Sequence, residues 1–378
     1  MKIVLKILQK MLSVIGILFL LIVIISILFI NLSPQFGGKA NKEELKRYSQ
    51  SKQFKGEEFF NLGDVKNDMS AKDMVKALGG LFKKIPKAIP DSQLPVTELD
   101  SAQVANYNGE TQFIWFGHST FLLQINKLNI LIDPMFGAVP APHPLLGTKR
   151  FNTKLPLSIA QLPHIDAVIL SHDHYDHLDY QSIVQLKEKV NHFYTPLGLG
   201  VHLKKWGVAA TNITELDWWQ NTSIAGLTLT CTPAQHFSGR GLNDKNKTLW
   251  SSWVIESTTE RLFFSGDSGY GPHFKTIGRK FGEFDFAMVE CGQYNKMWPE
   301  IHMFPEETVQ AGLDINAKLI MPIHWGAFKL AQHTWTDPVE RAVRKAKELN
   351  VPIITPQIGV PTSIYIDKPT VETWWQNH

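Results

Sequence analysis

Apolar and polar positions divide the chain into three stretches, of which the first is a long apolar run. Residues 12–30 are nineteen residues without a charge, interrupted only by Ser13, Gly16 and Ser26. As a helix this run spans roughly 29 Å, which matches the hydrocarbon thickness of a bilayer. A cleavable signal peptide has a shorter apolar region and an A-x-A-like site, and residues 31–34 (NLSP) contain no such site. Residues 1–31 are therefore predicted to be an N-terminal transmembrane helix that stays as a membrane anchor. A signal peptide is the alternative.

The charges that flank this run predict its orientation. Lys2, Lys6 and Lys10 precede it, so the positive-inside rule places the N-terminus in the cytoplasm and the rest of the chain outside. Four basic residues between positions 39 and 47 follow the run and oppose this assignment.

Residues 32–105 are polar and of mixed charge, and are predicted to be a connector with short helices at 43–50 and 73–78. The second helix is expected to stop at Gly79 and Gly80. Between 81 and 89, lysines alternate with apolar residues. This pattern fits either a segment on a membrane surface or ordinary packing on the next domain.

Residues 106–378 alternate short apolar runs with loops and are predicted to form one folded domain. Runs of β-branched or aromatic residues bounded by Gly, Asn or Pro predict strands at 113–116, 121–125, 129–132, 167–170, 224–230, 252–256, 262–265, 286–289, 319–323 and 353–355. Helical spacing predicts helices at 180–190, 306–315 and 338–349. Turns of hairpin length join the early strands, so we expect two sheets packed face to face with helices outside, rather than a doubly wound parallel sheet.

Composition narrows the possible functions. The chain has 378 residues, 44% of them hydrophobic, which is enough for a sizeable core. The net charge of +3 gives no electrostatic case for nucleic acid. Two cysteines exclude a disulfide-stapled scaffold and a four-cysteine zinc site. Histidine is abundant, with 14 residues, and several of them cluster.

The strongest cluster is SHDHYDH at residues 171–177, directly after the apolar strand predicted at 167–170. Three histidines and two aspartates in such a loop are costly to bury without partners, and a metal ion removes that cost. In extended chain His172 and His174 point the same way and can bind one ion. Asp176 and His177 follow a turn and can face a second ion.

The H-x-H-x-D-H motif after an apolar strand resembles the metallo-β-lactamase superfamily. This resemblance implies an α/β fold, a four-layer αββα sandwich, with one or two metal ions in a groove at its edge. It also implies further ligands on loops that follow strands. His236, Asp267 and His324 each follow a predicted strand, in the expected order.

Within that superfamily, residues 105–350 resemble the phospholipases D that hydrolyse N-acyl-phosphatidylethanolamine. The resemblance rests on SHDHYDHLDY (171–180), GDSGY (266–270), IHWG (323–326), IGRKFG (277–282), GHST (117–120) and His302 before PEE (305–307). Two features depart from that pattern. These are the N-terminal anchor and MVECGQY (288–294), which places an acid and a thiol in a run expected to be more apolar.

The resemblance assigns roles to the site residues. His172, His174 and His236 would bind the first zinc, Asp176, His177 and His324 the second, and Asp267 would bridge them. A hydroxide formed between the ions would attack the substrate, oriented by Asp176, and His302 would protonate the leaving group. His118, Asp133 and Asp173 are expected to support the site through hydrogen bonds. The residue types do not distinguish Zn²⁺ from Mn²⁺ or Fe²⁺.

These expectations predict a membrane-anchored, zinc-dependent phosphodiesterase of the phospholipase D type that acts on N-acyl-phosphatidylethanolamine or a related phospholipid. The loop at 140–158 mixes apolar and basic residues, which would suit an acyl chain beside a phosphate. The alternatives are a dinuclear-metal esterase or lactonase, and a membrane-tethered metal-binding protein without turnover. The sequence does not indicate the oligomeric state.

Overall fold

The computed structural model describes residues 2–63, 65 and 85–378. Within these residues, two mixed β-sheets face each other. The first has seven strands in the order β15-β3-β4-β5-β6-β7-β8, and the second has six in the order β14-β13-β12-β11-β10-β9. A separate hairpin consists of β1 (Phe54–Lys55) and β2 (Glu58–Phe59).

The strands of the first sheet are β3 (Gln112–Trp115), β4 (Phe121–Ile125), β5 (Leu128–Ile132), β6 (Ile165–Ile169), β7 (Val190–Pro196), β8 (Ile213–Leu216) and β15 (Thr362–Ser363). Those of the second are β9 (Asn221–Ile224), β10 (Leu227–Thr232), β11 (Ser252–Glu256), β12 (Arg261–Phe264), β13 (Phe286–Glu290) and β14 (Ile320–Ile323). In each sheet an antiparallel half joins a parallel half: β5 to β8 are parallel in the first, and β12 to β14 in the second.

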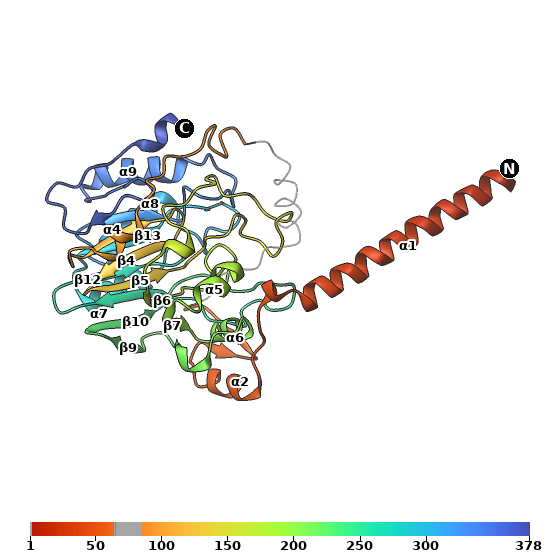
Figure 1. Ribbon diagram of the computed structural model, residues 1–378, viewed down its shortest axis with the longest axis horizontal. Coiled ribbons are helices and arrows are strands. Elements are labelled where there is room, and N and C mark those ends of the chain that lie inside the picture. The colour runs from red at the N-terminus through yellow and green to blue at the C-terminus, as the bar shows by residue number, and fades with distance from the viewer. Residues whose placement is uncertain (1, 64, 66–84) are drawn as a thin grey trace.

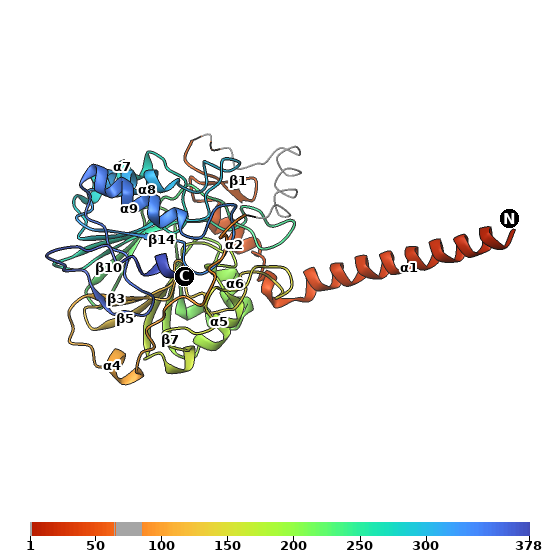
Figure 2. The same cartoon turned by 90° about the horizontal axis from the view of Figure 1, so that it is seen from above.

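The α-helices of the described residues are α1 (Lys2–Leu32), α2 (Lys42–Tyr48), α4 (Ser101–Ala105), α5 (Tyr180–Leu186), α6 (Gly200–Lys205), α7 (His273–Phe281), α8 (Pro305–Asp314) and α9 (Asp337–Leu349). Helices α7, α8 and α9 cover the outer face of the second sheet, while α5 and α6 cover the first (Figures 1 and 2). The predicted four-layer αββα sandwich is therefore confirmed.

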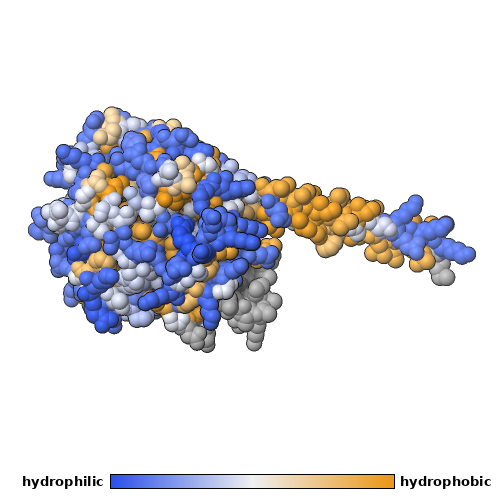
Figure 3. Space-filling model, turned by 90° about the horizontal axis from the view of Figure 1, so that it is seen from below, coloured by the Kyte–Doolittle hydropathy of each residue, from blue (hydrophilic) through white to orange (hydrophobic). Residues whose placement is uncertain are grey.

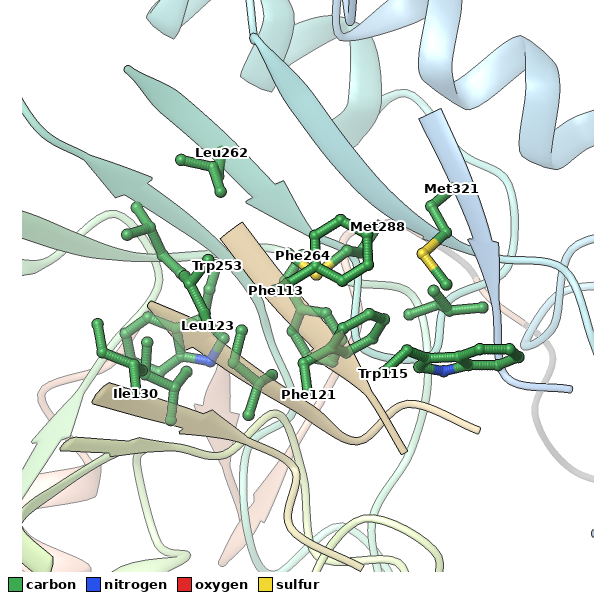
Figure 4. Packing of buried hydrophobic residues seen from close by; sticks show 14 of the residues in the cluster. Phe113, Trp115, Phe121, Leu123, Ile130, Trp253, Leu262, Phe264, Met288 and Met321 are labelled. Atoms are coloured by element: carbon green, nitrogen blue, oxygen red, sulfur yellow. The ribbon is translucent and has the colours of Figure 1, made fainter. Parts of the chain in front are cut away.

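The main core lies between the two sheets. Alternate side chains of β3, β4 and β5 meet those of β11 to β14 (Figure 4). Phe113 stacks on Phe286 with ring centroids 4.9 Å apart, and Trp115 lies 5.5 Å from Trp325. Because these strands are covered on both faces, nearly every residue in them is apolar. This rigid double layer positions the loops at its edge.

Helix α1 projects from the sandwich (Figure 1), and none of its residues is buried. It is long and apolar enough to cross a membrane, and is the one such helix among the described residues. Its apolar surface runs up to the body of the molecule (Figure 3).

The segment after α1 packs on the sandwich. Helix α2 overlaps the predicted helix at 43–50 but begins one residue earlier and ends at Tyr48, while the helix predicted at 73–78 lies outside the described residues. Tyr48 and Phe59 are fully buried in the main core, and Asn61 exchanges hydrogen bonds with the backbone of His236. The predicted divisions at 31/32 and 105/106 stay predictions, but this part of the connector folds onto the domain.

Several predicted elements need correction. The strand predicted at 224–230 is two strands, β9 and β10, joined by a turn at Ala225 and Gly226, which both have positive φ. The helix predicted at 180–190 ends at Leu186, and β7 begins at Val190. The strand predicted at 353–355 is a single bridge between Ile353 and Ile320.

Candidate metal centre

The polar residues of the candidate site follow strands that end at one edge of the sandwich. In the second sheet β10, β12 and β14 run in the same direction, because β10 and β12 are each antiparallel to β11 while β12 to β14 are parallel. His236, Asp267 and His324 follow these three strands, and the 171–177 loop follows β6 of the facing sheet. The carboxyl ends of strands that run in one direction meet at one edge of a sheet, which brings these distant residues together.

Four side chains form the first group, centred on His174. Nδ1 of His174 lies 3.0 Å from Nε2 of His172 and 3.1 Å from Nε2 of His236. Oδ2 of Asp267 lies 3.7 Å from Nε2 of His172 and 3.8 Å from Nε2 of His236. All four ligand atoms lie within 4.8 Å of one another. Imidazole nitrogens with a carboxylate oxygen are a donor set that zinc and related divalent metals accept.

Hydrogen bonds behind the first group orient two of its histidines. Nδ1 of His236 lies 2.9 Å from the carbonyl oxygen of Ile301, and Nδ1 of His172 lies 2.9 Å from Oγ of Ser171. A proton on Nδ1 in both rings leaves a lone pair on Nε2, facing His174. Burial lowers the pKa of all three histidines, well below 6.5 for His172 and His236. The rings are therefore neutral at pH 7, the state in which imidazole binds a metal.

A second group consists of His118, Asp176, His177 and His324, whose ligand atoms also lie within 4.8 Å of one another. Oδ2 of Asp176 is 2.8 Å from Nε2 of His118, 3.4 Å from that of His177 and 3.5 Å from that of His324. Nε2 of His177 and Nε2 of His324 are buried without a hydrogen-bond partner. Such atoms are rare and costly in folded proteins, and a bound cation would satisfy both. The residues present therefore fit a metal ion here.

Asp267 connects the two groups. Its Oδ2, which borders the first group, also lies 3.2 Å from Nε2 of His177, and its Oδ1 accepts a hydrogen bond from Nδ1 of His324. Gly266 permits this placement, because it has φ of +60° and a Cβ there would lie 2.8 Å from Cβ of Ser171. Oδ2 therefore borders both groups, the position of a carboxylate shared by two ions.

Charge holds the second group together. Burial opposes ionisation of Asp176 and Asp267, yet the neighbouring imidazoles, His177 first, outweigh it and hold both pKa values well below 3.8. Burial likewise opposes a charge on His177, but Asp267 and Asp176 outweigh it and raise its pKa well above 6.5. His177 thus carries a proton between two carboxylates, and a bound cation would displace that proton.

Asp133 supports both groups from beneath. Its Oδ1 accepts a hydrogen bond of 2.8 Å from the backbone N–H of Ser171, and its Oδ2 accepts bonds of 2.5 Å from Oγ of Ser171 and 2.7 Å from Nδ1 of His177. Ser171 in turn contacts His172. The carboxylate therefore orients one histidine of each group, as outer hydrogen-bond partners of metal ligands do.

Three residues of this region have backbone conformations that are uncommon without glycine. They are His118 with φ of +56°, Asp133 with +40° and His324 with +68°. Such conformations cost about 1–3 kcal/mol and persist where the surroundings impose them, commonly at functional sites. The sandwich thus holds these side chains against a local preference.

His302 lies beside the two groups, with its ring centroid 5.0 Å from that of His236 and 5.4 Å from that of His324. Its Nδ1 hydrogen-bonds to Oε1 of Glu290, the last residue of β13. Burial raises the pKa of Glu290 to about 8. In the sequence this acid stands out only as a departure from the family pattern. One signal could have identified Glu290 as a site residue: it is a carboxylate at the end of an apolar strand, and the predicted ligands also follow apolar strands.

Asp173 lies away from both groups. Its Oδ1 accepts a hydrogen bond of 2.8 Å from the backbone N–H of Gly239, and its Oδ2 accepts one of 2.9 Å from Oγ1 of Thr248. Its carboxylate therefore ties the 171–177 loop to the loop that follows His236. Ser171 and the Ile301 carbonyl were missed from sequence, because their partners are fixed only in three dimensions.

The structure thus brings together every residue predicted to bind metal, namely His172, His174, Asp176, His177, His236, Asp267 and His324. It adds His118, which was expected only to support them. Metal binding by these residues is part of the proposed function.

The chain is similar to known proteins over most of its length. The family described as "Beta-lactamase superfamily domain" matches residues 128–325. An uncharacterized protein of Mycobacterium tuberculosis is 42% identical over 272 residues, covering 70% of this chain and 73% of that protein. The N-acyl-phosphatidylethanolamine-hydrolyzing phospholipase D 1 of Caenorhabditis elegans is 34% identical over 257 residues, covering 65% and 71% respectively.

Solved structures support the fold. A metallo hydrolase from Ignicoccus hospitalis superposes with a TM-score of 0.51 at 18% identity, covering 68% of this chain and 99% of that one. Together with the sandwich and the family match, these similarities show that the chain belongs to the metallo-β-lactamase superfamily of metallo-hydrolases and has relatives among the N-acyl-phosphatidylethanolamine-hydrolysing phospholipases D.

Proposed function

We propose that this protein is a membrane-anchored, metal-dependent phosphodiesterase that cleaves N-acyl-phosphatidylethanolamine or a related phospholipid and releases phosphatidic acid. The observation that carries the proposal is the pair of ligand groups that share Asp267. The named activity of the Caenorhabditis elegans relative supports the choice of substrate. Helix α1 is taken to span the bilayer without cleavage, with the domain outside the cytoplasm.

The first group would hold one ion through His172, His174 and His236, and the second group another through Asp176, His177 and His324, with Asp267 between them. Two divalent ions, zinc by preference, would supply hydroxide at neutral pH and stabilise charge on the phosphoryl oxygens. The donor set also accepts Mn²⁺ or Fe²⁺.

The protein's own groups position water and protons. The Asp176 carboxylate is ionised and lies at the centre of the second group, where it accepts the hydrogen bond of an attacking water and orients it. His302 has Nδ1 engaged by Glu290, so Nε2 remains to donate a proton to the departing alkoxide. Glu290 acts through His302 and is a positioning residue.

A groove of about 490 Å³ beside the 140–158 loop is a candidate site for part of the lipid. Ile89, Pro90 and Phe151 line it together with Lys149 and Lys329, so apolar and basic groups lie side by side. Arg150 has a different role. It is buried, donates to backbone carbonyls of Met135 and Gly137, and lies 4.5 Å over the Phe328 ring. The lysines, rather than Arg150, would meet a lipid phosphate.

The test is turnover of three labelled substrates by full-length protein, with and without chelator. The substrates are N-acyl-phosphatidylethanolamine, a lactone and a generic phosphodiester. The proposal predicts chelator-sensitive release of phosphatidic acid from the first. Turnover of the lactone alone would replace it with an esterase or lactonase, and inactivity on all three with any metal supplied would leave a tethered metal-binding protein.

A further inference from the structure

The chain that leaves α1 is held by α6 with the residue that follows it, and by the loop that follows His236. Within residues 34–38, one carbonyl accepts a hydrogen bond of 2.7 Å from Nε1 of Trp206 and another accepts one of 2.8 Å from Nε of Arg240. A backbone N–H of the same segment donates to Nδ1 of His202 over 3.1 Å. The segment lies so close to α6 that a Cβ on Gly38 would lie 2.2 Å from a backbone carbonyl oxygen.

Arg240 carries this attachment on to the 171–177 loop. Its Nη1 donates to the carbonyl oxygens of Asp173, over 2.5 Å, and Leu178, over 2.8 Å. Its guanidinium lies 4.0 Å over the ring of Tyr175. Arg240 is buried and three residues from Phe237, which packs on His174. The end of α1 is therefore fixed relative to the first ligand group.

Three leucines beside this junction are highly exposed. Among described residues outside α1, the most exposed large apolar side chains are Leu145, Leu242 and Leu146, at 87%, 78% and 65%. We call them the leucine patch. Single exposed leucines are ordinary, but three on two neighbouring loops mark an interaction site.

Contacts place both loops at the end of α1. The ring of His143, two residues before Leu145, has its centroid 6.0 Å from that of Phe29 in α1. Phe29 also packs on Phe36, with ring centroids 5.4 Å apart. A Cβ on Gly241, the neighbour of Leu242, would lie 3.5 Å from the Phe36 ring. Figure 1 shows α1 leaving the sandwich near α5 and α6, at the side that carries these loops.

The apolar run of α1 sets the depth of this region. Residues 12–30 span roughly 29 Å, about one hydrocarbon thickness. Phe29 is the last residue but one of that run, so it lies at the boundary between hydrocarbon and headgroups on the domain's side. Loops that touch Phe29 and Phe36 therefore lie at headgroup level, where exposed leucines reach apolar surroundings.

We propose that the leucine patch inserts into the same bilayer that α1 spans, and that α1 and the patch together hold the ligand loops against the lipid surface. The partner is a phospholipid bilayer, argued from the continuity of the patch with the end of α1. The inference rests on the part of the proposed function that makes α1 an uncleaved anchor. It does not depend on which lipid is hydrolysed.

The test is depth-dependent fluorescence quenching on full-length protein in phosphatidylethanolamine–phosphatidylglycerol vesicles. Cys231 and Cys291 are buried, so Leu145→Cys and Leu242→Cys can be labelled selectively with a small fluorophore. The matched control is Leu349→Cys, an exposed leucine at the end of α9, a helix that lies far from α1 in both views (Figures 1 and 2). A nitroxide near the headgroup should quench the two patch probes at least threefold more than the control. Equal quenching at all three positions, or failure of the protein to stay in the vesicles, would overturn the proposal.

Activity separates this inference from the substrate assignment. Replacing all three leucines by serine should lower turnover of vesicle lipid at least fivefold, and Leu242→Ser alone, which lies outside the 140–158 loop, should leave turnover of a water-soluble short-chain analogue within twofold. Unchanged turnover of vesicle lipid would contradict the inference. If the patch probes are quenched in a protein that cleaves no lipid, the leucine patch still inserts into the bilayer, but the proposed substrate is wrong.

Discussion

The two ligand groups differ in how the protein prepares them. In the first, burial lowers the pKa of His172, His174 and His236, and outer hydrogen bonds orient two of the rings. In the second, Asp176 and Asp267 hold a protonated His177 between them. The first group is preorganised for a metal by neutral donors. The second is held by an ion pair that a metal would replace, so the groups should bind their ions with different sensitivity to pH.

The largest expected effect comes from the residue that both groups share. Asp267→Asn keeps the shape of the side chain but removes the charge facing both groups, so we expect turnover to fall roughly a thousandfold or more and bound metal to fall below two ions per chain. Elemental analysis with a turnover assay measures both. The control is Asp285→Asn, which lies just before β13, at the end of the strand opposite to the site, and its turnover should stay within about twofold of wild type. Normal metal content in Asp267→Asn would mean that the carboxylate does not bridge.

The pH dependence of metal binding should separate the groups. The pKa of His177 is raised without metal, so an ion entering the second group must displace a proton, and its affinity should rise with pH across neutrality, by up to about tenfold per pH unit. The first group's histidines already lack a proton there, so its affinity should change little. Calorimetric titration in buffers of different ionisation enthalpy counts the protons released. Equal pH slopes for both ions would contradict the claim that only the second group releases a proton on binding metal.

Asp133 tests whether one support serves both groups. Asp133→Asn should weaken metal binding and turnover by about 10- to 100-fold, because it loosens Ser171 and His177 together. Ser171→Ala removes the Oγ contacts with His172 and Asp133 but leaves the bond between Asp133 and His177, so it should cost less, mainly at the first ion. Metal competition with a chromophoric chelator measures both variants. A larger loss in Ser171→Ala than in Asp133→Asn would contradict this arrangement.

The smallest expected effect concerns Glu290. Its pKa of about 8 means that the side chain is protonated at pH 7, where Glu290→Gln should change turnover by less than about threefold. Above pH 8 the wild-type side chain loses its proton while glutamine cannot, so the two pH profiles should diverge there. A full profile from pH 6 to 10 provides the comparison. A large defect already at pH 6 would show that Glu290 acts as a carboxylate throughout.

The site residues at strand ends were predictable because each one follows an apolar run that is visible in the sequence. His172 to His177 follow an apolar strand, and His236, Asp267 and His324 each end a recognisable run. The elements that were missed lack this contrast between an apolar run and its polar flanks. Asn221 to Ser223 are polar because β9 lies at a sheet edge. Helix α7 contains Gly278, where a Cβ would lie 2.3 Å from the carbonyl oxygen of Asp314, and a glycine within a helix weakens its sequence signal.

Outer contacts were less predictable, because they join segments whose proximity only the fold determines. His118 was expected to support the ligands, and its Nε2 does hydrogen-bond to Asp176. The sequence did not show that His118 would also lie among the ligand atoms of the second group, because its backbone contact with Trp325 joins distant segments. Glu290 stood in a quoted motif without a role, and no role was predicted for Arg240. Arg240 binds the chain after α1, which is distant in sequence, and Glu290 meets His302 across a loop whose path only the fold determines.

The most direct test titrates Zn²⁺ into metal-depleted, full-length protein in vesicles that contain N-acyl-phosphatidylethanolamine, and follows bound metal and released phosphatidic acid together. The account predicts that phosphatidic acid appears as the second ion binds and disappears again with chelator. Full activity in metal-free protein, or with one ion per chain, would contradict a dinuclear centre built on Asp267.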